Sequence, residues 1–197
     1  MPLVRLQTLI DRLEALPPGG VTVPAVEAIL ADGTLDEREL QRFVGTLPHK
    51  YARRKVHRSR WFDVMALTWA PGQFTPIHNH AGNCGWVRLV RGQIAEETFR
   101  QVPGGSLPDA GVAGEVGDRG GNVGLELTGA GVISAVGAVA TADRVRAIHR
   151  LGNPASPGGD VTVTLHVYSL PHDRCLTFDA ERRTVSVREL AYDPEPV

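Results

Sequence analysis

Two histidines separated by one residue, His78 and His80, form the most chemically informative short pattern in this sequence. On an extended strand, side chains two residues apart point to the same face, so both imidazoles can bind one metal ion. The alternative for such a pair is two surface histidines without a ligand. The residues around the pair must therefore decide between these interpretations.

Glycines flank the pair where tight turns would border a metal-binding hairpin. Gly72 lies six residues before His78, and Gly92 lies twelve residues after His80. These spacings resemble the first motif of the cupin family, in which a glutamate ligand follows the two histidines. Gly85 stands at that glutamate position, so the usual carboxylate ligand is missing.

A third histidine resembles the second cupin motif, in which asparagine follows histidine by four residues. His149 and Asn153 have this spacing, although the Pro-x-Gly that usually precedes the motif is absent. The resemblance implies one metal site built from His78, His80 and His149.

Three imidazoles would give this site a particular chemistry. They are neutral ligands, and they leave the full charge of a divalent ion uncompensated and part of its coordination sphere open. Open positions favour catalysis over a structural role, and the uncompensated charge favours an anionic donor such as a thiolate. Zinc, nickel and copper also accept three imidazoles, so the ligands alone do not select the metal.

Three further segments resemble the cysteine dioxygenase family, whose members are iron-dependent thiol dioxygenases with a cupin fold. Tyr51-Ala52-Arg53 is similar to the family's Tyr-x-Arg, and His149-Arg150 is similar to its third-ligand pair. The third segment is Leu165-His166-Val167-Tyr168-Ser169 with Pro171, Asp173, Cys175, Phe178 and Asp179 after it.

The resemblance implies one Fe(II) per chain and roles for five further residues. Arg53 would bind the substrate carboxylate, a task that suits the planar guanidinium, and Tyr51 would face the same way. Tyr168 would direct its hydroxyl toward bound substrate or oxygen, supported by His166 and Thr164.

The segment Val161–Tyr168 alternates apolar and polar residues, as a strand with two different faces does. Its polar face could be exposed to solvent. Alternatively, it could point into a barrel and place His166 and Tyr168 over the metal.

Two departures from the animal members of the family bear on the chemistry. Those enzymes link a cysteine covalently to the tyrosine that corresponds to Tyr168, whereas here Cys84 stands one residue early and Gly85 takes the cysteine's place. A shift of one residue reverses the face of a strand, so we expect no thioether. Leu170 replaces a proline after Ser169, so we expect no cis peptide there.

These observations favour a non-haem Fe(II) dioxygenase that oxidises L-cysteine with O2 to cysteine sulfinate. A dioxygenase acting on 3-mercaptopropionate or another small thiol is an alternative, although relatives specialised for 3-mercaptopropionate carry glutamine at the position of Arg53. Another cupin dioxygenase or a metal-dependent isomerase is less well matched, because the glutamate ligand is missing. The alternative outside enzymes is a non-catalytic cupin that binds a small ligand.

The elements that must position these residues change character along the chain. Residues 1–48 have the apolar spacing of helices, with a third helix predicted after Thr34-Leu35-Asp36-Glu37. Residues 49–192 read as short strands between Gly/Pro turns, with a glycine-rich loop at about 103–121. The predicted strands include Asp63–Trp69, Trp86–Val90, Ile94–Phe99, Val123–Leu127, Val132–Val139, Val161–Tyr168 and Thr184–Leu190. We therefore predict a mainly β, single-domain cupin, a small jelly-roll β-barrel behind an N-terminal helical segment, over residues 1–197.

Composition agrees with one globular domain. The 197 residues carry 21 basic and 22 acidic side chains, and this balance argues against nucleic acid as a partner. No apolar run approaches the roughly 20 residues that span a bilayer, so no membrane partner is expected. Two cysteines cannot form a disulfide framework, and acidic residues interrupt the apolar N-terminal stretch. We accordingly expect a cytoplasmic monomer whose partners are a small thiol and O2.

Overall fold

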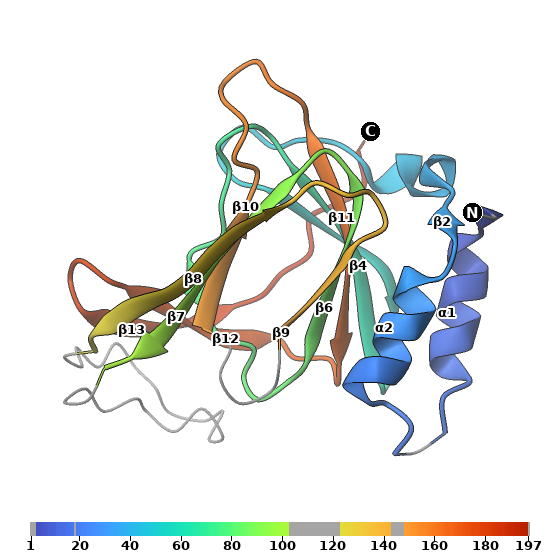
Figure 1. The fold of residues 1–197 in the computed structure, drawn as a ribbon, viewed down its shortest axis with the longest axis horizontal. Coiled ribbons are helices and arrows are strands. Elements are labelled where there is room, and N and C mark those ends of the chain that lie inside the picture. The colour runs from blue at the N-terminus through green and yellow to red at the C-terminus, as the bar shows by residue number, and fades with distance from the viewer. Residues whose placement is uncertain (1–2, 18, 103–122, 143–147, 197) are drawn as a thin grey trace.

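The computed structural model describes residues 3–17, 19–102, 123–142 and 148–196. Within these ranges the chain forms a β-barrel of two sheets, with two α-helices on one side (Figure 1). The larger sheet has the strand order β13-β12-β5-β10-β7-β8, and the smaller has the order β3-β4-β11-β6-β9. The predicted mainly β fold with N-terminal helices is confirmed. The predicted glycine-rich loop lies outside the described residues.

The smaller sheet contains strands that are buried on both faces along nearly their whole length, β4, β6 and β11. Its members are β3 (Ala52–Arg58), β4 (Phe62–Trp69), β6 (Gly85–Arg91), β9 (Val139–Ala142) and β11 (Thr162–Ser169). The larger sheet contains β5 (Ile77–His78), β7 (Ile94–Gln101), β8 (Leu125–Ile133), β10 (Ile148–Gly152), β12 (Arg174–Asp179) and β13 (Thr184–Glu189). A short parallel pair, β1 (Leu3–Val4) with β2 (Thr34–Leu35), closes the N-terminal segment.

The helices cover the outer face of the smaller sheet. Helices α1 (Leu6–Glu14) and α2 (Val23–Ala31) contribute apolar residues to one cluster with Val163, Leu165 and Val167 of β11. Because alternate residues of β11 take this face, Thr164 and His166 point to the barrel interior, where they are buried. The polar face of this strand therefore points inward, and the solvent-exposed alternative is wrong.

Two predicted elements differ from the structure. The third helix is a 3-10 helix over Glu37–Phe43, because Thr34 belongs to β2 and Asp36 instead caps the turn by accepting from the Arg38 amide at 3.1 Å. The predicted strand Val132–Val139 is interrupted between Ile133 and Val139. There the Ala138 amide donates to the Ala135 carbonyl and Gly137 adopts a φ of 89°, so the chain turns from β8 to β9.

No helix among the described residues has both the length and the apolar character needed to cross a membrane.

Candidate metal centre and its pocket

The three predicted ligands converge although they come from different elements. His78 ends β5, His80 follows it, and His149 lies on β10 directly across from His78 in the antiparallel register. Their candidate ligand atoms all lie within 4.8 Å of one another. Gly72 and Gly92 have φ angles of 78° and 79°, which glycine adopts without the strain that a Cβ causes.

Hydrogen bonds orient two of the imidazoles. Nδ1 of His149 lies 2.7 Å from a carboxylate oxygen of Glu96, and Nδ1 of His78 lies 3.1 Å from the Pro76 carbonyl. Since both partners are acceptors, each Nδ1 must carry the proton, and each Nε2 is left as an unprotonated ligand atom.

The third imidazole shows why a cation fits between the rings. Nε2 of His80 lies 3.0 Å from Nε2 of His149, while the buried Nδ1 of His80 has no hydrogen-bond partner. Two nitrogen lone pairs at this distance repel unless a cation or proton lies between them. Two ligands about 2.1 Å from one metal ion would lie about 3 Å apart at near-octahedral angles. The donor set therefore fits a mononuclear metal ion.

Burial keeps these imidazoles in the form that binds metals. Burial, reinforced by the neighbouring His149, lowers the pKa of His78 to about 3. Burial likewise holds the pKa of His80 well below its usual value, with His149 and His78 contributing in the same direction. Both side chains are accordingly neutral near pH 7.

The missing glutamate has a steric explanation. A Cβ built on Gly85 would lie 2.8 Å from a His80 ring carbon and 2.9 Å from a Tyr168 ring carbon. Gly85 and Tyr168 are paired across β6 and β11, so a longer side chain at position 85 would displace both rings. Cys84 packs instead in the apolar cluster beneath the helices. This placement on the opposite face agrees with the expected lack of a thioether.

A hydrogen-bonded series leads from the barrel interior to Tyr168. The Trp69 indole N–H donates to the Thr164 hydroxyl oxygen at 2.9 Å, and that oxygen lies 3.0 Å from Nε2 of His166. Because Nε2 is the acceptor within reach of the buried Thr164 hydroxyl, the His166 proton belongs on Nδ1, 3.3 Å from the Tyr168 oxygen. This assignment leaves the Tyr168 hydroxyl proton free to be donated.

Burial fixes the protonation of this series. It lowers the pKa of His166 to about 3, with the Arg53 charge adding to the effect, and it raises the pKa of Tyr168. His166 is therefore a neutral imidazole and Tyr168 a neutral phenol over the physiological pH range.

Arg53 reaches the same pocket, and the C-terminal segment holds it there. Its Nη1 donates to the Ala191 carbonyl at 3.3 Å, and its guanidinium carbon lies 4.9 Å from the centre of the Tyr192 ring. The neighbouring Arg54 points the opposite way and donates to the carbonyls of Phe43, Gly45 and Pro194. Tyr51 stacks on Trp69 with ring centres 4.4 Å apart.

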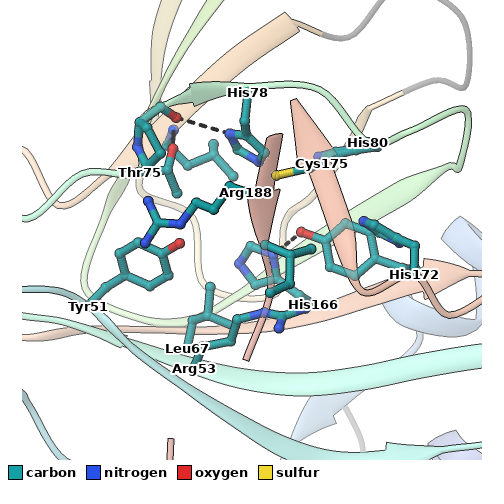
Figure 2. A pocket seen from close by; sticks show the side chains of 14 residues that line it. Tyr51, Arg53, Leu67, Thr75, His78, His80, His166, His172, Cys175 and Arg188 are labelled. Atoms are coloured by element: carbon teal, nitrogen blue, oxygen red, sulfur yellow. Dashed lines mark hydrogen bonds between the residues drawn. The ribbon is translucent and has the colours of Figure 1, made fainter. Parts of the chain in front are cut away.

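One pocket unites these side chains with residues that the sequence did not single out (Figure 2). His172 approaches Tyr168 edge-on, with ring centres 5.2 Å apart. Arg188 comes from β13, where the apolar alternation of Val185 and Val187 indicates a solvent-facing position for it. All the described candidates meet here: Tyr51, Arg53, His78, His80, His166 and Tyr168 line the pocket, His149 contacts His80, and Thr164 contacts His166.

The barrel and the three converging imidazoles define a cupin with a three-histidine metal site. The family model for cysteine dioxygenase type I matches residues 4–181, so the chain belongs to that family. Cysteine dioxygenase type 1 of Danio rerio is 25% identical over 160 residues, which cover 81% of this chain and 71% of the relative. The human protein of the same name is 26% identical over 160 residues, with 81% and 70% covered. A Klebsiella pneumoniae protein with a double-stranded β-helix domain aligns with a TM-score of 0.44 and 15% identity over 66% of this chain and 81% of that chain.

Proposed function

We propose that this protein is a non-haem Fe(II) dioxygenase that oxidises L-cysteine with O2 to cysteine sulfinate. The observation that carries the proposal is the convergence of three imidazoles, without a carboxylate ligand, beside Arg53 and Tyr168. His78, His80 and His149 would hold the iron, which would supply a Lewis acid for the thiolate and the redox chemistry of O2. Both oxygen atoms of O2 end on sulfur, so thiolate and O2 balance to sulfinate.

The remaining residues bind and orient the substrate. Arg53 binds the carboxylate, because its guanidinium faces the pocket and has no carboxylate partner of its own among the described side chains. Tyr51 provides a partly buried wall beside it, and burial raises the pKa of its phenol, which stays neutral. Tyr168 donates its hydroxyl proton toward the reacting atoms, because Nδ1 of His166 occupies its acceptor side and Thr164 orients that imidazole.

A substrate panel tests this proposal. Protein loaded anaerobically with Fe(II) is mixed with O2 and L-cysteine, 3-mercaptopropionate or cysteamine, and both O2 uptake and sulfinate formation are measured. We expect the highest kcat/KM for L-cysteine and the lowest for cysteamine, which has no carboxylate for Arg53. A higher kcat/KM for 3-mercaptopropionate would refute L-cysteine as the substrate while keeping the thiol dioxygenase class.

The same panel of thiols also tests the non-catalytic alternative. A ligand-binding cupin would bind these thiols, as measured by anaerobic calorimetry, without consuming O2. Binding without O2 uptake for every thiol would contradict the enzymatic proposal.

A further inference from the structure

The pocket has more positively charged side chains than are needed to bind one substrate carboxylate. Its lining includes two guanidinium groups, Arg53 and Arg188, and no aspartate or glutamate among the described residues. The metal ligands are neutral imidazoles, so they do not offset this charge. A ligand that enters the pocket therefore meets two fixed positive charges before any metal ion is counted.

Arg188 lines the same pocket as Arg53. It lies on β13 directly across from Cys175 of β12, another pocket residue, and it is exposed. Figure 2 shows Arg188 beside Tyr51, and its charge acts on the Tyr51 phenol by lowering the pKa that burial raises. Among the described residues, no ion pair joins Arg188 to a carboxylate, whereas the next residue, Glu189, pairs with Arg174.

The amino group of L-cysteine does not match this second charge. If Arg53 binds the substrate carboxylate, L-cysteine has no second anionic group for Arg188 to bind. A second carboxylate in that place would be attracted instead. The solvated-surface interpretation of Arg188 explains its exposure but not its position on the pocket wall.

We propose that Arg188 binds a second carboxylate and that the pocket takes thiols with two carboxylate groups, one on Arg53 and one on Arg188. This inference rests on the proposed function for the thiol chemistry and the role of Arg53, and it extends the substrates beyond L-cysteine. Mercaptosuccinate is the matched probe, because it is 3-mercaptopropionate with one added carboxylate on the carbon that carries sulfur.

The first test measures binding without metal, thiol or turnover. Calorimetry with the metal-free protein compares succinate with propionate, which lacks the second carboxylate. We expect succinate to bind about tenfold more tightly, a size typical of one charge-assisted contact at a partly exposed site. Arg188→Gln should reduce the ratio to about two or less. Arg182→Gln, which removes the same charge from the β12–β13 hairpin outside the pocket lining, should leave the ratio unchanged.

The second test measures turnover with the Fe(II)-loaded protein. We expect kcat/KM for mercaptosuccinate to exceed that for 3-mercaptopropionate, and Arg188→Gln to lower the ratio by about tenfold through KM. O2 uptake with L-cysteine but no preference for the second carboxylate in either test would overturn this inference and leave the proposed function standing. Succinate binding that depends on Arg188, without O2 uptake for any thiol, would support the second carboxylate site and overturn the proposed function.

Discussion

The two faces of the smaller sheet hold their arginines in different ways. On the outer face, Arg54 and Arg88 are buried, and each donates to backbone carbonyls of the N-terminal segment. Arg88 binds the carbonyls of Leu30 and Gly33 at the end of α2, where helix carbonyls lack partners. On the inner face, Arg53 makes one longer contact with a carbonyl and faces the pocket.

The difference separates two uses of one residue type. A buried guanidinium that donates to several backbone carbonyls fixes the segment it contacts, and its burial keeps it from a ligand. A guanidinium with free donors on a pocket wall can bind one. Substitutions on the two faces should therefore affect different quantities.

The largest effect is expected at the metal. His149→Ala removes a ligand and leaves the Glu96 carboxylate without its imidazole, so iron content and turnover should both fall below detection. Metal analysis after gel filtration and O2 uptake check this result. Full turnover in this variant would contradict the proposal that His149 is one of three metal ligands.

Tyr168→Phe should reduce kcat about 100-fold and leave iron content unchanged. The variant keeps the ring against Gly85 and His80 but loses the hydroxyl proton that the His166 contact directs outward. Steady-state kinetics with metal analysis checks the prediction. Because the phenol is already neutral at pH 7, the loss should be nearly constant between about pH 6 and pH 8.

Arg53→Gln should raise the KM for L-cysteine about 10- to 100-fold with a smaller change in kcat. The amide keeps hydrogen-bonding capacity but loses the charge and the fork that hold a carboxylate. Thermal denaturation provides the control, because this residue lies on the pocket side and its loss should change Tm little. An unchanged KM would show that Arg53 does not bind the carboxylate of the substrate.

Arg88→Met should show the reverse pattern. It leaves buried carbonyls at the end of α2 without donors, which costs about 3 kcal/mol of unfolding free energy and lowers Tm by about 6–12 °C. The folded variant should keep the KM and kcat of the parent protein at low temperature. A change in KM without a change in Tm would contradict the division between the two faces.

Cys84→Ser should have the smallest effect on activity. Its thiol lies in the outer apolar cluster, so it has no path to Tyr168. The intact mass of the parent protein should equal the mass calculated from the sequence, without the loss of two hydrogens that a thioether causes. A mass lower by two hydrogens that is restored in Cys84→Ser would show that a thioether forms.

Local spacing indicated only that His78 and His80 could bind one ion, because residues two apart on an extended segment share a face. His149 and the series of Thr164, His166 and Tyr168 were predicted from the resemblance to known families. Local spacing could not assign the inward face of β11, since both faces are buried and alternation alone does not say which one the helices cover. His172 and Arg188 were missed for a related reason. A loop and an edge strand bring them to the pocket, and that placement depends on tertiary structure. The third helix was predicted from a capping pattern that the pairing of β2 with β1 overrides.

The shortness of β5 has a consequence for local unfolding. This two-residue strand joins the β12–β13 hairpin to β10, and its His78 is paired with His149 on one side and with Thr177 on the other. Two of the three candidate ligands, His78 and His149, thus lie on the paired strands β5 and β10, which connect the hairpin to the rest of the larger sheet. A metal ion bound by both ligands would oppose the separation of β5 from β10. Metal binding should therefore slow hydrogen exchange of the hairpin amides, and a substitution that loosens the hairpin should weaken metal binding.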